Sequence, residues 1–116
     1  MDIRDELLRT IALEETALSR LRGAIGREYE DAVHAMHACH GKIVITGIGK
    51  SGLIAQKIAS TMVSTGTPAI FLHPAEGMHG DIGIVHKDDI VIAISKSGES
   101  DELIALLPSI RKIGAR

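Results

Sequence analysis

From Lys42 to the C-terminus, short apolar runs rich in β-branched residues alternate with segments of helical spacing. The runs are Ile43–Ile45, Pro68–Leu72 and Asp89–Ile94, and each has the length of a strand rather than of a helix. Because little polar alternation interrupts them, they predict strands buried on both faces, as in a parallel sheet covered by helices. The order strand, helix, strand, loop, strand, helix therefore favours an α/β fold with a parallel sheet.

The segments around these runs complete the predicted organisation. Residues 2–22 and 28–39 have helical spacing and charged outer positions, and glycines follow each of them. We therefore predict a helical lead-in over residues 1–40 and an α/β part over residues 41–116. Within the second part we predict helices over residues 53–64 and 98–113 and a loop over residues 73–87.

The prediction for residues 53–64 includes an orientation. Their apolar residues recur with helical spacing, and we expect the helix to turn four of them inward, namely Ile54, Ile58, Ala59 and Met62.

Composition excludes several classes of function. Aromatic residues make up 2% of the 116 residues and the net charge is −2, which argues against a nucleic-acid partner. No apolar run is long enough to span a bilayer, and the N-terminus lacks the apolar core of a signal peptide. Cys39 is the only cysteine, so no internal disulfide can form. We expect a soluble, cytoplasmic protein with no membrane partner.

Three serines follow the third predicted strand, in the segment Ser95–Ser100, directly before a predicted helix. The first N–H groups of a helix have no internal partner and lie at the positive end of the helix dipole. Hydroxyl donors beside them and the small Gly98 suit a phosphate, although a serine can also cap a helix without any ligand. Three hydroxyls exceed what one cap needs, so we favour a phosphate site.

The segment Gly47–Gly52 forms a second glycine-rich turn between a strand and a helix. Its G-x-G-x-x-G pattern is shared with dinucleotide-binding folds, but the second strand ends in Leu72 and His73, without the acidic residue that would bind a ribose. A P-loop is excluded because Val44 stands where its first glycine belongs. Both turns follow parallel strands, so we expect them at one edge of the sheet, where ligands of such folds bind.

Histidines and carboxylates lie close to these turns in the sequence. His73, His79 and His86 share the middle loop with Asp81, but their spacing matches no standard metal motif. We expect no metal site there, and we expect His79 to contact a substrate or to pack against the loop. Glu102, in the first turn of the last predicted helix, could complement the helix dipole or move a proton beside a bound phosphate.

Five segments in this order resemble the sugar isomerase (SIS) domain family, and in particular its arabinose 5-phosphate isomerase branch: Gly47–Gly52, Ser64–Pro68, His73–Glu76, His79–Gly83 and Ile94–Ser100. The resemblance implies a flavodoxin-like parallel sheet in a three-layer sandwich. It implies an isomerase that interconverts D-ribulose 5-phosphate and D-arabinose 5-phosphate for the synthesis of the lipopolysaccharide sugar Kdo. It implies no organic cofactor, and a homodimer or homotetramer.

The resemblance also implies a role for individual residues. The substrate phosphate would be held by one glycine and four serines, namely Gly49, Ser51, Ser95, Ser97 and Ser100. Lys50 would stabilise developing negative charge on the sugar oxygens, Glu102 would transfer a proton, and His79 would line the pocket. An enediolate intermediate requires such a base and such a cation.

One departure from the family concerns length. Relatives continue with further strands and active-site residues, so we expect this chain to be truncated after the third strand and inactive alone, or to pair its exposed edge with another copy. Two alternatives remain. A non-catalytic phosphosugar-binding regulatory module would need a basic recognition helix upstream, which residues 1–40 lack, and a nucleotide-binding domain would need the missing ribose acid.

Overall fold

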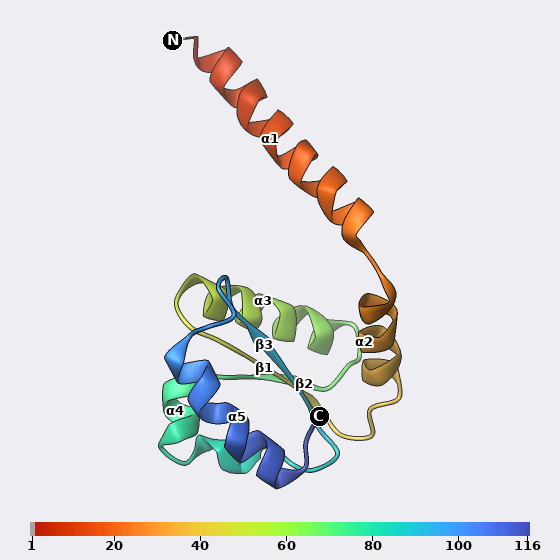
Figure 1. The fold of residues 1–116 in the computed structure, drawn as a ribbon, viewed down its shortest axis with the longest axis vertical. Helices are drawn as coiled ribbons and strands as arrows, with labels where there is room; N and C mark the ends of the chain where they lie inside the picture. The colour runs from red at the N-terminus through yellow and green to blue at the C-terminus, as the bar shows by residue number, and fades with distance from the viewer. Residues whose placement is uncertain (1) are drawn as a thin grey trace. The chain divides into compact units, whose positions relative to one another are not determined.

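The computed structural model describes residues 2–116, which divide into two compact units with their boundary between Ala35 and Met36 (Figure 1). The elements in chain order are α1 (Ile3–Ala24), α2 (Arg27–His37), β1 (Ile43–Gly47), α3 (Lys50–Ser64), β2 (Ala69–Leu72), α4 (Pro74–Met78), the 3₁₀ helix η1 (Asp81–Ile84), β3 (Ile90–Ile94) and α5 (Asp101–Ile113).

The first unit contains α1 and most of α2. Asp2 caps α1, because its carboxylate accepts a hydrogen bond of 2.9 Å from the backbone N–H of Arg4. No residue of α1 is buried. Propensity and capping therefore form this helix, and its apolar residues contribute no core to the described unit.

The second unit is built on a parallel sheet with the strand order β2-β1-β3. The register places Ile43 of β1 beside Ala69 of β2 and beside Ile90 of β3. β1 is thus the central strand, and all five of its residues are buried. This confirms the predicted α/β fold with an open parallel sheet.

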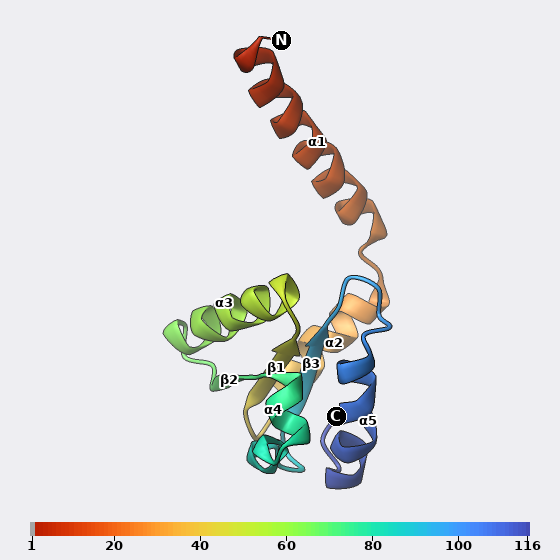
Figure 2. The same cartoon turned by 90° about the vertical axis from the view of Figure 1, so that its left-hand side faces the viewer.

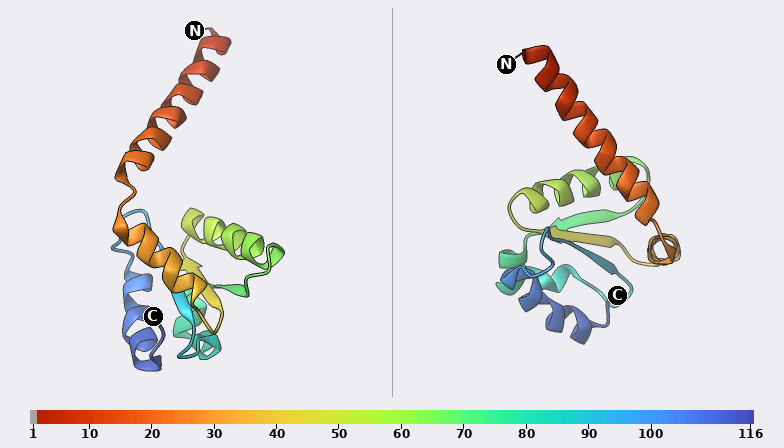
Figure 3. Two further views of the ribbon diagram at one scale, coloured as in Figure 1. Left: turned by 90° about the vertical axis from the view of Figure 1, so that its right-hand side faces the viewer. Right: turned by 45° about the horizontal axis from the view of Figure 1, so that its top comes forward.

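Helices cover both faces of this sheet, as the views in Figures 2 and 3 show. On one face, Ile43 and Ile45 of β1 pack against Ala55 and Ala59 of α3. On the other face, Val44 packs with side chains from β2, the segment after η1, and the C-terminus, on the side where α4 and α5 lie. The period-2 alternation of a strand divides β1 between the two layers, which explains why its sequence is apolar throughout.

A buried carboxylate joins the beginnings of β1 and β3. Asp89 is 3% exposed and accepts hydrogen bonds from the Lys42 ammonium (2.6 Å), the Lys42 backbone N–H (2.9 Å) and the His86 backbone N–H (2.8 Å). Burial acts to raise the pKa of Asp89, but these donors outweigh it and hold the pKa below the ordinary value of 3.8. The carboxylate therefore remains ionised and ties the two strands together.

The outer edge of β3 is partly occupied by the chain itself. The backbone N–H of Arg116 donates to the Asp89 carbonyl at 3.2 Å, and the Val91 N–H donates to the Arg116 carbonyl at 2.8 Å. This is the bonding pattern of a parallel strand pair. Val91 and Ala93 also line a groove of about 290 Å³, together with Leu107 and Ile110 of α5 and with the C-terminal Ala115 and Arg116.

Three details of the sequence prediction were wrong. The last helix begins at Asp101 instead of Gly98, because Gly98 has a φ of 72°, which a right-handed helix does not accept. α3 begins at Lys50, three residues before the predicted start. Ile54 is 55% exposed although we expected it to face inward, because the buried residues of α3 are the small Gly52, Ala55 and Ala59.

The segment predicted as a loop over residues 73–87 contains α4 and η1. Pro74 stands at the first position of α4, and His73 caps this helix through Nδ1, which accepts a bond of 3.1 Å from the Ala75 N–H.

Candidate functional site

The candidate site lies where β1 and β3 end. The strand register pairs Gly47, the last residue of β1, with Ile94, the last residue of β3. The turns that follow, called here the β1 turn (Gly47–Ser51) and the β3 turn (Ser95–Ser100), therefore leave the same edge of the sheet from neighbouring strands. Both views in Figures 1 and 2 show the two turns at this end of the sheet. The sequence prediction that they share one edge is confirmed.

The β1 turn ends directly in α3. Gly49 is the residue before the helix, its φ is 60°, and it has no side chain that could cap the first N–H groups. Lys50 and Ser51 form the first turn of α3, with Lys50 exposed and Ser51 half-buried. The helix thus presents its positive end, an ammonium and a hydroxyl at the sheet edge, which suits an anion.

Close backbone contact fixes the position of this helix start. A Cβ on Gly52 would lie 2.6 Å from the Gly47 carbonyl oxygen, so only glycine lets α3 approach the end of β1 this closely. Gly47 and Gly52 therefore serve this close packing, and the donors come from Lys50, Ser51 and the backbone N–H groups at the start of the helix.

Serine hydroxyls organise the β3 turn. The Ser95 and Ser100 hydroxyl oxygens are 3.1 Å apart and hydrogen-bonded, Ser95 Oγ accepts from the Gly98 N–H at 3.0 Å, and Ser97 Oγ accepts from the Glu99 N–H at 3.1 Å. Ser100 occupies the N-cap position of α5, yet its side chain makes no capping bond to the helix. These bonds preshape the turn and leave the first N–H groups of α5 without a side-chain cap.

The structure places two of the three predicted catalytic residues at the helix starts above this edge. Lys50 is the first residue of α3, and Glu102 is the second residue of α5; both are exposed. Glu99, which the sequence placed in the first turn of the last helix, lies in the β3 turn before it. The edge thus combines a cation from the β1 side with a carboxylate from the β3 side.

His79 lies on a different segment from these residues. It follows α4, is exposed, and its backbone N–H donates to the Glu76 carbonyl at 3.1 Å. α4 comes after β2, the other neighbour of β1, so it also belongs to the carboxyl edge of the sheet. His73, which caps α4, makes an edge-to-face contact with the Phe71 ring, with 6.3 Å between ring centroids.

Sequence reasoning missed one polar group in the sheet. Thr46 is 1% exposed, and its hydroxyl has no hydrogen-bond partner within the part of the chain that the structure describes. It lies in β1 directly before Gly47. In the sequence, only the position of a threonine directly after an apolar run could have indicated this buried hydroxyl. The predicted strand ended one residue earlier, at Ile45.

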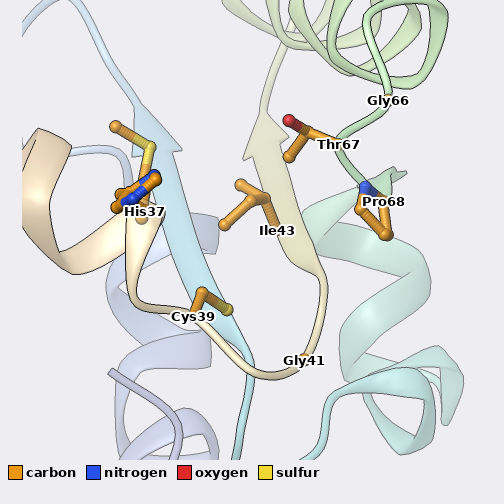
Figure 4. Close-up of a pocket in the computed structure, with 8 residues that line it drawn as sticks. His37, Cys39, Gly41, Ile43, Gly66, Thr67 and Pro68 are labelled. Carbon is orange, nitrogen blue, oxygen red and sulfur yellow. The ribbon is translucent and has the colours of Figure 1, made fainter.

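Another pocket, of about 210 Å³, lies away from the two turns (Figure 4). It is lined by Ile43, the first residue of β1, by Gly66–Pro68 before β2, and by His37 and Cys39. These positions mark the amino edge of the sheet, opposite the carboxyl edge. The Cys39 thiol there donates to the Asp88 carbonyl at 3.4 Å. The pocket is therefore separate from the candidate site.

Residues 2–116 contain neither a metal-binding cluster nor a membrane-spanning helix. No group of three or more His, Cys, Asp or Glu side chains is arranged to hold a metal ion. In the same residues, every helix is too short or too polar to cross a membrane.

Comparison with known proteins gave consistent matches. Residues 36–116 match the SIS domain family. The chain is 45% identical over 114 residues to arabinose 5-phosphate isomerase KdsD of Pseudomonas aeruginosa, a match that covers 98% of this chain and 35% of that protein. The chain thus spans about a third of the length of the curated relatives it matches.

Solved structures show the same similarity. A protein of Escherichia coli CFT073 in complex with arabinose 5-phosphate is 42% identical with a TM-score of 0.89, and the match covers 99% of this chain and 63% of that chain. A putative sugar-phosphate isomerase of Listeria monocytogenes is 36% identical with a TM-score of 0.91, and the match covers 99% and 62% of the two chains.

Proposed function

The chain belongs to the SIS domain family, and from that premise we propose that it supplies the phosphosugar-binding part of an aldose–ketose isomerase for D-ribulose 5-phosphate and D-arabinose 5-phosphate. The relatives at 45% identity and the neighbour in complex with arabinose 5-phosphate support this substrate class. The observation that carries the proposal is the pairing of Gly47 with Ile94 in the sheet. This pairing places the starts of α3 and α5, neither of which has a side-chain cap, at the carboxyl edge of the sheet.

The substrate phosphate binds between the two turns in this proposal. Helix N-terminal N–H groups and the dipoles of α3 and α5 attract it, and hydroxyls add donors. The residues assigned to the phosphate are Gly49, Ser51, Ser95, Ser97 and Ser100. Binding at a group remote from the reacting carbons provides energy for positioning the sugar.

The chemistry requires proton transfer between neighbouring carbons. A base removes a proton from the carbon next to the carbonyl, an enediolate forms, and the proton returns to the other carbon. We assign Glu102 as this base, Lys50 as the cation that stabilises the enediolate oxygen, and His79 as a residue lining the pocket. Neither a metal nor an organic cofactor enters the proposed reaction.

The proposal extends to cellular role and assembly. The resemblance implies that the product supplies the synthesis of Kdo for lipopolysaccharide, in the cytoplasm. We also propose that the protein acts as a homodimer or homotetramer, because α1 exposes a stripe of apolar residues that its own unit leaves uncovered.

The test compares Glu102 of α5 with Glu99 of the preceding β3 turn in the full-length product of the gene. Glu102→Gln should lower isomerisation of D-arabinose 5-phosphate by at least about a hundredfold and leave calorimetric binding of the sugar phosphate in place. The control Glu99→Gln, also an exposed carboxylate beside the site, should retain activity. Binding without turnover in the unaltered protein would contradict an enzyme and indicate a regulatory phosphosugar-binding module.

A further inference from the structure

The β3 side of the candidate site is rich in carboxylates. Glu99 lies in the β3 turn, Asp101 and Glu102 lie in the first turn of α5, and all three residues are exposed. None of the three takes part in an ion pair among residues 2–116. The first turn of α3, on the β1 side, contains no acidic residue. Negative charge is therefore concentrated on one side of the phosphate site proposed above.

The substrate adds further negative charge to this side. A phosphate monoester carries a charge of about −1.5 to −2 at pH 7, because its second pKa is about 6. Repulsion between like charges that share a site opposes binding. The two carboxylates in the first turn of α5 also lie at the positive end of that helix dipole, and they weaken its attraction for another anion. The residues assigned to the phosphate are a glycine and four serines, so none of them offsets this charge.

Lys96 is the one cation in this part of the chain. Residues 88–110 contain no other lysine or arginine. Lys96 stands in the β3 turn between Ser95 and Ser97, whose hydroxyls are both assigned to the phosphate. Because consecutive Cα atoms are about 3.8 Å apart, the Lys96 backbone lies next to both of these donors.

Hydrogen bonds hold the β3 turn in a closed loop. The Ser95 and Ser100 hydroxyl oxygens at its two ends are 3.1 Å apart, and Ser97 Oγ accepts from the Glu99 N–H at 3.1 Å. Lys96 is exposed on this loop, and neither of the two ion pairs among residues 2–116 includes it. The Lys96 ammonium is therefore available to an anion at the turn.

We propose that Lys96 is the charge partner of the substrate phosphate and that it determines the affinity of the site for phosphorylated sugars. Lys96 offsets the carboxylates of the β3 turn and of the first turn of α5, whereas Lys50 on the β1 side acts on the enediolate oxygen. The two lysines thus have separate roles, one in binding and one in the reaction. This inference rests on the proposed function, because the phosphate site is part of that function.

The first test measures steady-state kinetics with D-arabinose 5-phosphate in the full-length product of the gene. Lys96→Gln should raise KM about tenfold, because it removes one unit charge a few Å from a dianion in an exposed site. The same variant should keep kcat within about twofold, because the lost interaction is shared by substrate and transition state. Lys50→Gln should instead lower kcat. Lys96→Arg keeps the charge and should keep KM within about threefold of the wild type.

Lys57→Gln is the matched control, because it removes the same charge from an exposed lysine of α3. Lys57 follows Lys50 by about two helical turns, roughly 10 Å along the axis of α3. This separation is about one Debye length at 0.1 M salt, so the control should keep the KM of the wild type. Circular dichroism verifies that all variants keep their helix content.

The second test distinguishes a charge role of Lys96 from a structural one, by calorimetric binding of D-arabinose 5-phosphate. The tenfold loss of affinity in Lys96→Gln should shrink to less than about threefold in 1 M NaCl, where the Debye length is about 3 Å. Adding Glu99→Gln should restore most of the affinity, because a lost attraction and a lost repulsion then cancel. A structural role of Lys96 predicts neither response.

The outcomes separate this inference from the proposed function. If Lys96→Gln binds the sugar phosphate as tightly as the Lys57→Gln control, or loses kcat at an unchanged KM, the role of Lys96 is overturned. An affinity loss that persists in high salt and with Glu99→Gln also contradicts the role, and recovery under both conditions supports it. Absence of binding in the unaltered protein would overturn the proposed function itself, and the inference would fall with it.

Discussion

Gly52→Ala adds one methyl group at the contact between α3 and the end of β1. The new Cβ would lie 2.6 Å from the Gly47 carbonyl oxygen and 3.2 Å from the Gly47 carbonyl carbon. Ordinary contact begins at 3.4 Å, so helix and strand must separate by about 0.8 Å, the difference between 3.4 and 2.6 Å. Both obstacles are backbone atoms, which cannot rotate away as a flexible side chain can.

Two terms decide the size of the effect. Overpacking of this kind costs about 1–3 kcal/mol, whereas alanine in place of glycine within a helix stabilises by up to about 1 kcal/mol. The net expectation is a loss of about 1–2 kcal/mol in the free energy of unfolding. Because Ser51 precedes Gly52 in the first turn of α3, the same displacement should also weaken binding of a sugar phosphate.

Urea denaturation followed by circular dichroism measures the loss as a lower midpoint at an unchanged slope. Gly83→Ala provides the matched control, because a Cβ there meets nothing within 4 Å and its φ is not in the left-handed region. The control should stay within about 0.5 kcal/mol of the wild type. A Gly52→Ala protein as stable as the control would refute the claim that backbone contact at Gly47 requires glycine.

Two further predictions concern buried polar groups. Asp89→Asn should lower the free energy of unfolding at neutral pH, and its difference from the wild type should shrink in acid. Folding lowers the pKa of Asp89, so the ionised carboxylate stabilises the fold above the unfolded pKa near 3.8. This stabilisation is lost as the pH falls through the folded pKa. Urea midpoints of the wild type and the variant at pH 7 and pH 3 measure the two differences in stability. Equal differences at both pH values would argue against an ionic role for Asp89. Thr46→Val removes a buried hydroxyl without a partner in the described residues and should raise the free energy of unfolding by about 1 kcal/mol; a loss of stability by thermal melting would show that the hydroxyl is bonded.

The α/β order was predictable because its signals are local. Continuous apolar runs such as Ile90–Ile94 and glycines after helices reflect strands buried on both faces and chain reversals. Helix boundaries were harder to predict from the sequence. Whether Gly98 begins a helix or belongs to a turn depends on which acceptor takes its N–H, and here Ser95 Oγ accepts it. Sequence spacing does not show that choice.

The candidate site was predictable in its parts and less so in its assembly. The serines after β3 were noted because they follow a predicted strand, whereas the role of Lys50 was what the family resemblance implied. The common edge of the two turns followed from parallel topology. The exposure of Ile54 and the burial of Ala55 depended on how closely α3 approaches the sheet, which the glycine pair at Gly47 and Gly52 determines. The close approach of α3 to β1 is a tertiary contact, and the spacing of apolar residues along the helix does not predict it.

The phosphate assignment has a direct measurement. Backbone amide resonances of ¹⁵N-labelled protein are recorded by NMR while D-arabinose 5-phosphate is added, with unphosphorylated D-arabinose as the control. Amides of the β1 turn and of the β3 turn should shift together, with one shared dissociation constant, and the control sugar should leave them in place. Shifts confined to one turn, or equal shifts with the sugar that lacks phosphate, would contradict a phosphoryl group held between the two helix starts.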